Sequence, residues 1–239
     1  IRMYLFLLKI VVNTTILLYN KNKGGDKMDL YKELAAMRCF TRDGLAKRLG
    51  SASAAAWQIQ KFLEKGYIER VRRDLYVVMS LETDQPIPNR FQIASSVAED
   101  AYVSHHSAFE YYGYANQVFY EVYVATGKRV RPFSYDGIDY CPVGHRGIEG
   151  VVEMGNGVRV TSLERTVIDG IADFEKIGGL EELLRCMLLI PSLSPNHLLS
   201  SLDLYHCGKL YQKAGYILEM FQEDFGLPES FFDECEKHL

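Results

Sequence analysis

The residues of this sequence that are best suited to chemistry are two adjacent histidines, His105 and His106, which stand between Ser104 and Ser107. A serine next to a histidine could form a nucleophile with its general base. Adjacent residues on a helix or strand point in different directions, however, and the sequence has no G-x-S-x-G turn of the kind that exposes a nucleophilic serine. We therefore expect Ser104 to end a strand or cap a helix, and one histidine to be a hydrogen-bonded packing residue.

Two cysteine–histidine pairs could supply metal ligands. Cys141 lies shortly before His145, and His206 is adjacent to Cys207. A closed zinc site needs about four ligands, and neither pair has a second pair at matching spacing. The five cysteines also lack the C-x-x-C spacing of a metal or redox site. We therefore predict no metal and no cofactor, and we expect reduced thiols in a cytoplasmic protein.

The charged residues near position 165 have structural explanations. Thr161 and Glu164 have the spacing of a capping box at the start of a helix, and Arg165 and Asp169 have that of an i,i+4 helix pair. The sequence has neither a Walker A loop nor a Rossmann glycine fingerprint, and its tail lacks the carboxylate and lysine array of a nuclease. We predict that the protein is not an enzyme.

The net charge of −4 is distributed unevenly along the 239 residues. Residues 1–27 carry a net charge of +4 and residues 28–80 another +4, whereas residues 81–239 carry −12. Affinity for nucleic acid depends on local neutralisation of phosphates, so the basic part matters more than the acidic total. The asymmetry favours a nucleic-acid-binding module fused to an acidic domain.

Residues 1–18 are apolar but are interrupted by Lys9 and Asn13. The run is too short and too broken for a membrane span, and no small-residue cleavage site follows it. The stretch from Lys23 to Met28 can be back-translated as a purine-rich ribosome-binding site ahead of a start codon. We therefore expect Met28 to be the native start, residues 1–27 to be a leader extension, and the protein to have no contact with a membrane.

Residues 28–80 have the pattern of a winged helix-turn-helix. Thr41 and either Ser51 or Ser53 are suited to cap helices, and Gly50 breaks the chain between them. Two β-rich runs around a basic turn predict a hairpin wing. We predict three helices and the hairpin over residues 29–38, 42–49, 51–65 and 67–79.

The third helix is predicted to carry the base-reading face. Its inner face is expected to hold Ala55, Ala56, Ile59, Phe62 and Leu63, and its outer face Ser53, Ala54, Trp57, Gln58 and Lys61. The amide of Gln58 has the geometry that reads adenine, and the arginines of the wing suit phosphates or the minor groove. The residues predicted to contact DNA are Arg42, Lys47, Arg48, Ser51, Ser53, Trp57, Gln58, Lys61, Arg70, Arg72 and Arg73. Two alternatives stay open: a winged helix that contacts only protein, and Trp57 as a packing residue.

Residues 81–90 contain two prolines among mixed polar residues and are typical of a linker. Residues 91–239 then form the C-terminal domain. Helices are expected at 91–100, 105–112, 162–174, 179–190, 196–206, 209–224 and 228–237. Strands are expected at 102–104, 118–125, 135–143, 151–154 and 158–161. We predict an α+β fold: an N-terminal winged helix-turn-helix plus a C-terminal α+β domain with a small sheet and a helical tail.

Three stretches of the chain resemble the AbiEi antitoxins of abortive-infection, type IV toxin–antitoxin systems. The first is the winged-helix segment Leu45–Met79. The second, Tyr102–Tyr112 (YVSHHSAFEYY), is similar to the family's Y-[IV]-S-H-x-S-A-L motif. The third, Gly157–Arg185, contains VTSLERTVID, similar to V-T-S-x-E-R-T-[LIV]-[LIV]-D. With the tail Lys209–Phe221, the resemblance covers nearly all of Met28–Leu239, and only residues 1–27 have no counterpart.

The resemblance implies a protein of two functions. The N-terminal domain would bind double-stranded DNA at inverted repeats in its own promoter and repress its operon. The C-terminal antitoxin domain would antagonise a nucleotidyltransferase toxin without forming a stable complex, as part of phage defence. The alternative is a plain winged-helix transcriptional regulator, or a nucleic-acid-processing enzyme or interaction module, without a toxin partner.

Overall fold

A computed structural model describes residues 29–238, which divide into two units between Ile87 and Pro88. The extension over 1–27 and the start expected at Met28 lie outside the described residues. The segment predicted as a linker is shared between the units: the Ile87 N–H donates to the carbonyl of Val78, and Asn89 caps the first helix of the second unit. No helix in the described part of the chain is both long and apolar enough to cross a membrane.

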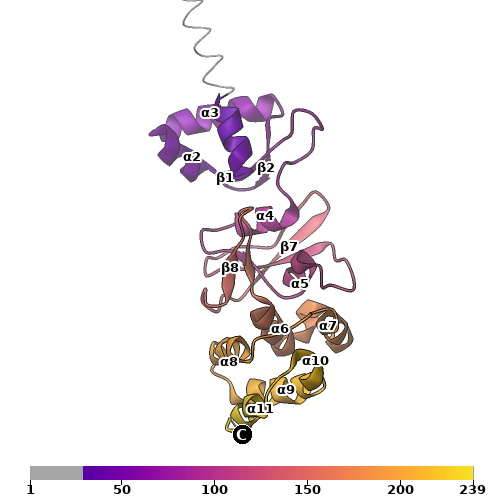
Figure 1. The fold of residues 1–239 in the computed structure, drawn as a ribbon. Coiled ribbons are helices and arrows are strands. Elements are labelled where there is room, and N and C mark those ends of the chain that lie inside the picture. The colour runs from indigo at the N-terminus through magenta and orange to yellow at the C-terminus, as the bar shows by residue number, and fades with distance from the viewer. Residues whose placement is uncertain (1–28, 239) are drawn as a thin grey trace, which may run out of the picture. The chain divides into compact units, whose positions relative to one another are not determined.

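The first unit has the architecture of a winged helix-turn-helix, as predicted (Figure 1). A helix over residues 29–37 precedes β1 (Cys39–Thr41), α2 (Arg42–Leu49), α3 (Ala52–Glu64), β2 (Ile68–Arg72) and β3 (Leu75–Val78). Strand β3 lies between β1 and β2 and pairs antiparallel with both. The apolar core of this unit lies between its helices and this sheet. Its largest fully buried side chains are Leu34, Leu45 and Ile68.

Local caps explain the break between α2 and α3. Thr41 Oγ1 accepts a hydrogen bond from the Gly44 N–H at 2.9 Å, and Ser51 Oγ accepts one from the Ala54 N–H at 3.2 Å. Between them Gly50 has a φ of 67°, in the left-handed region that ends helices. The two predicted caps are therefore confirmed, with Ser51 and not Ser53 at the start of α3.

The second unit contains a mixed six-stranded sheet in the order β6-β7-β5-β4-β9-β8. Its strands are β4 (Tyr102–Val103), β5 (Glu121–Ala125), β6 (Phe133–Tyr135), β7 (Ile138–Val143), β8 (Val151–Glu153) and β9 (Arg159–Thr161). Strand β4 pairs antiparallel with β5 and parallel with β9. The single strand predicted over 135–143 is wrong: Asp136 and Gly137 have φ values of 51° and 73° and turn the chain into the β6–β7 hairpin.

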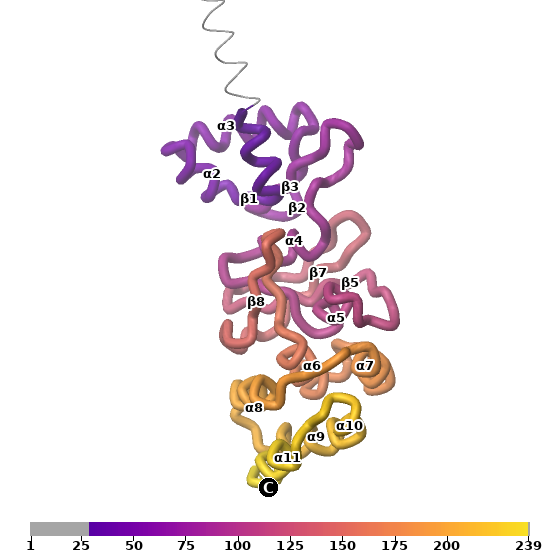
Figure 2. The backbone as a smooth tube through the Cα atoms, viewed as in Figure 1, coloured from indigo at the N-terminus to yellow at the C-terminus, as the bar shows by residue number. Residues whose placement is uncertain are grey.

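Two helices lie beside the sheet strands and the rest form a helical tail. Helices α4 (Arg90–Ser95) and α5 (His106–Tyr112) both contact β5. The tail consists of α6 (Leu163–Ala172), a 3-10 turn over Phe174–Ile177, α7 (Leu180–Met187), α8 (Pro195–Asp203), α9 (Gly208–Glu219), α10 (Gln222–Phe225) and α11 (Glu229–Glu236). In Figures 1 and 2 these helices gather at one end of the second unit. A continuous apolar cluster runs through them and reaches Phe109 of α5.

The structure corrects three of the predicted helices. The helix expected over 209–224 is divided, since α9 ends at Glu219 and α10 begins at Gln222. The helix expected over 91–100 is α4, which ends at Ser95. Helix α6 is capped by Ser162, whose Oγ accepts the Arg165 N–H, so the capping box expected from Thr161 and Glu164 does not form. The Thr161 hydroxyl is used elsewhere, since it lies 2.7 Å from that of Thr166.

The predicted pair of Arg165 and Asp169 is confirmed, and it is buried. Arg165 Nε donates to Asp169 Oδ1 at 2.8 Å, with side-chain exposures of 1% and 3%. Arg165 Nη1 also donates to the carbonyl of Glu149 at 2.8 Å, and the Tyr205 hydroxyl donates to Asp169 Oδ1 at 2.6 Å. Burial opposes the charge of Arg165, but the Asp169 carboxylate outweighs it and the pKa of the guanidinium is raised.

We expect Arg165→Ala to lower the free energy of unfolding of the second unit by about 3–5 kcal/mol, because it leaves Asp169 buried without its charged partner. Arg185→Ala is the matched control. It breaks an i,i+4 pair with Glu181 on α7 whose side chains are 49% and 80% exposed, and it should cost no more than about 0.5 kcal/mol. Urea unfolding followed by circular dichroism measures both. Equal losses from the two variants would contradict this account.

Candidate nucleic-acid interface

Helix α3 turns one face to the core and the other to solvent. Ala55, Gln58, Ile59 and Phe62 are buried, at the alternating spacing of three, one and three that marks one side of a helix. The opposite side is made of small and polar residues around one aromatic side chain. Its exposed members are Ala52, Ser53, Ala54, Ala56, Trp57, Gln60 and Glu64.

The base-reading role predicted for Gln58 is wrong in this structure. Gln58 is only 6% exposed, because it lies one turn from both Ala55 and Phe62 and shares their inward face. Its Nε2 has no hydrogen-bond partner among residues 29–238. Ala56, which was expected inside, is exposed, and the amide on the outer face is that of Gln60. The spacing of the buried positions identifies this face, whereas the polarity of the Gln58 side chain alone points to the opposite one.

Trp57 lies on the outer side of α3 and is 50% exposed. Ser53 and Gln60 are one helical turn away on either side, so the three residues share one surface. The Ser53 hydroxyl is 2.9 Å from that of Ser51, which caps the helix. Small neighbours on this surface would let a base edge approach the helix backbone closely.

Carboxylates partner three of the predicted DNA-binding cations. The Arg42 N–H donates to Asp74 Oδ1 at 3.0 Å, and its Nε lies 3.8 Å from the same oxygen. Arg48 forms two hydrogen bonds to Glu33 of the first helix, which hold the pKa of this exposed carboxyl below its ordinary value. A third pair, Lys61 with Glu64, lies within α3 at 3.0 Å.

Other cations of the set have different surroundings. Arg70 donates to the Tyr76 hydroxyl at 3.2 Å across the hairpin. Arg72 is half-buried at the end of β2, and Arg73 is exposed in the turn. Lys47 is exposed on α2. Within residues 29–238, neither Lys47 nor Arg73 forms an ion pair, which leaves both charges available to a phosphate.

The turn of the wing is fixed to the start of α2. Arg73 and Asp74 connect β2 to β3, and Asp74 adopts a φ of 67°. Its carboxylate accepts the backbone N–H of Arg42 at the first turn of α2, where a negative charge is favourable. The wing and the helix-turn-helix are therefore held in one geometry by a contact that the sequence pattern did not predict.

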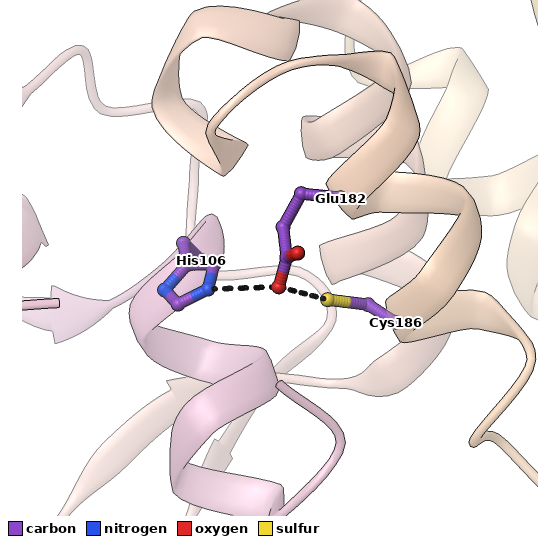
Figure 3. A group of neighbouring side chains, drawn as sticks. All are labelled: His106, Glu182 and Cys186. Atoms are coloured by element: carbon purple, nitrogen blue, oxygen red, sulfur yellow. Dashed lines mark hydrogen bonds and ion pairs between the residues drawn. The ribbon is translucent and has the colours of Figure 1, made fainter. Parts of the chain in front are cut away.

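The side chains suited to catalysis or to metal binding are buried or separated from one another. Ser104 directly follows β4, and its Oγ lies 2.9 Å from Nδ1 of His105, with exposures of 1% and 8%. Burial lowers the pKa of His105. Cys141, His145 and the His206–Cys207 pair join no group of three metal-binding side chains in the described part of the chain. His106 instead meets Glu182 and Cys186 in the interior, a grouping that the sequence analysis missed (Figure 3).

The two units thus define a winged-helix protein with a second α+β unit, and the predicted α+β class is confirmed. No protein-family model matches the chain, and no curated protein matches it. Among solved structures, the chain is similar to the crystal structure of the RV2827C protein from Mycobacterium tuberculosis. The likeness covers 87% of this chain and 80% of that one, with a TM-score of 0.54 and 14% identity. At this identity the likeness shows a shared fold alone.

The two amides of α3 give a matched pair of variants. We expect Gln60→Ala to reduce discrimination at about one base pair by about 1–3 kcal/mol, as for loss of one direct base contact. Gln58→Met keeps the volume of the buried side chain and should leave sequence preference unchanged. Competition binding against single-base-pair variants of the protein's own upstream DNA measures both. A loss of discrimination in Gln58→Met alone would contradict the assignment of faces.

If the first unit binds DNA, Lys47 and Arg73 should contribute to the salt dependence of that binding. We expect Lys47→Ala combined with Arg73→Ala to weaken binding to every duplex and to reduce the slope of log affinity against log salt by about 2, one unit for each lost phosphate contact. Lys128→Ala combined with Arg129→Ala removes the same charge from an exposed loop of the second unit. If this control weakens binding equally, net charge and not this surface is responsible.

Proposed function

We propose that the protein is a DNA-binding antitoxin that represses its own operon and antagonises a nucleotidyltransferase toxin. The observation that carries the DNA-binding part is the outer face of α3, where Ser53, Trp57 and Gln60 lie in one row. Small and polar residues on the second helix of a helix-turn-helix are suited to the major groove. The unpaired charges of Lys47 and Arg73 would position the unit on the phosphate backbone.

Charge also supports DNA as the partner of the first unit. Residues 28–80 carry a net charge of +4, whereas residues 81–239 carry −12. A strongly acidic unit is repelled by a polyanion, so attraction to DNA must come from the basic unit. A winged helix that contacts only protein would not require this difference.

The antitoxin part of the proposal rests on the sequence resemblance of the second unit. The two resembling stretches form β4 with α5, and β9 with α6 and α7. Strands β4 and β9 are parallel neighbours, with Val103 opposite Val160, and α5 contacts α6. The stretches therefore build one contiguous part of the unit, which supports reading them as a single functional module.

The experiment uses the full chain and the nucleotidyltransferase gene expected next to its own. We expect the protein to retard its own upstream DNA in preference to a random duplex of equal length, with affinity falling steeply as salt rises. We also expect co-expression to rescue cells from the neighbouring toxin. Equal binding to both duplexes would overturn the repressor function.

The variant Lys47→Ala combined with Arg73→Ala separates the two functions. Because its substitutions lie in the first unit, we expect it to lose repression of a promoter fusion and to keep rescue from the toxin. Specific DNA binding without rescue by the wild-type chain would support the plain transcriptional regulator instead. Cleavage or modification of the DNA probe would support the nucleic-acid-processing enzyme.

A further inference from the structure

Three side chains with metal-binding atoms meet in the interior of the second unit (Figure 3). Glu182 Oε1 lies 3.7 Å from His106 Nε2 and 3.6 Å from Cys186 Sγ. All three residues are buried, with exposures of 0% for His106, 3% for Glu182 and 0% for Cys186. Glu182 and Cys186 are one turn apart on α7, and His106 comes from the first turn of α5.

The imidazole of His106 is the unexplained group in this cluster. Neither Nδ1 nor Nε2 has a hydrogen-bond partner within residues 29–238, although the residue is fully buried. The ring stacks on Phe119 with centroids 3.8 Å apart, which fixes its plane. A buried polar group without a partner is rare in native proteins and calls for an explanation.

Glu182 is held in place by the loop that follows α5. Its two oxygens accept hydrogen bonds from the backbone N–H groups of Asn116 and Gln117 and from both side-chain amides, at 3.1–3.3 Å. Such contacts orient a ligating carboxylate in metal sites, where they fix the direction of its lone pairs. The carboxylate is therefore preorganised beside the imidazole and the thiol.

We propose that His106, Glu182 and Cys186 bind a zinc ion. Their nitrogen, oxygen and sulfur donors are the set that Zn²⁺ takes in proteins. Tetrahedral zinc with bonds of about 2.0–2.3 Å places its donors about 3.3–3.7 Å apart. The distance of 3.6 Å between Glu182 and Cys186 matches this spacing, the 3.7 Å between Glu182 and His106 needs only a small approach of the imidazole, and all three donors lie within 4.8 Å of one another. Three protein ligands leave the fourth position to water.

Binding exchanges one proton for the ion. Without zinc the Cys186 thiol donates its proton in a hydrogen bond to Glu182 Oε1. Zinc takes the lone pairs of the imidazole, the carboxylate and the sulfur, and the thiol proton passes to solvent. The ion would then connect α5 to α7 and stabilise the unit, whatever the protein's activity on DNA or on a toxin.

The test is metal analysis of the full chain, purified after growth with added zinc. We expect about one zinc ion per wild-type chain, and strongly reduced content in Cys186→Ser and in His106→Gln. Cys235→Ser is the matched control, since Cys235 is also a buried cysteine of this unit but lies outside the cluster. It should keep the zinc. Wild-type chain without stoichiometric zinc, or equal zinc in Cys186→Ser and wild type, would overturn the proposal.

Cobalt provides a readout that needs no variant to fold. The wild-type chain is stripped with a chelator and titrated with Co²⁺ alone. We expect the visible bands of tetrahedral cobalt with a near-ultraviolet thiolate-to-cobalt band, saturation near one equivalent, and release of about one proton per ion in weak buffer. Cobalt spectra without the thiolate band would overturn the assignment of Cys186. Because DNA binding is measured separately, failure here leaves the proposed function untouched.

Discussion

The second unit is organised around one buried cation. The guanidinium of Arg165 stays charged at any pH the protein meets, so it can be buried only where the fold supplies acceptors. Asp169 accepts from Arg165 within the same helix, and a second acceptor, the Glu149 carbonyl, precedes β8. Tyr205, whose hydroxyl donates to Asp169, follows α8. The full set of contacts therefore exists only when the sheet and the helical tail are both in place. We infer that the pair of Arg165 and Asp169 favours this one packing of the helical tail against the sheet over other packings, in which the charges would be buried without their partners.

A comparable constraint decides what α3 can present to a partner. The core of the first unit buries the face of α3 that contains Ala55, Ile59 and Phe62. Once that face is buried, the residues on the opposite face of the helix are fixed. The same constraint places Gln58 inside, at the cost of an amide nitrogen with no partner among the described residues. The residues available for recognition on the outside of this helix are therefore fixed by packing on the inside, and they are small or polar except for Trp57.

Sequence patterns predicted the features that depend on near neighbours. The caps Thr41 and Ser51 and the i,i+4 pair of Arg165 and Asp169 were predictable because each involves residues a few positions apart. The prediction for Gln58 failed because the position of a residue around a packed helix outweighs the polarity of its side chain. The dipeptide Asp136-Gly137 is typical of a hairpin turn, and it divides the strand predicted over 135–143. The meeting of His106 with Glu182 could not be predicted, since it depends on how α5 packs against α7 and on a loop that no local pattern places.

The ion pairs of Arg42, Arg48 and Lys61 reduce the positive charge that the first unit can offer to DNA. If this surface faces DNA as proposed, Arg42, Arg48 and Lys61 can each exchange a carboxylate for a phosphate at little cost, because exposed pairs contribute about 1 kcal/mol or less. The carboxylates that lose their cations then stay near the DNA, and their repulsion of the phosphates offsets part of the attraction gained from the cations. Lys47 and Arg73 leave no such carboxylate behind, so each contributes more attraction to DNA than Arg42, Arg48 or Lys61. A modest electrostatic attraction leaves a larger share of the binding free energy to base contacts, and this is the condition under which a small unit can discriminate between sequences.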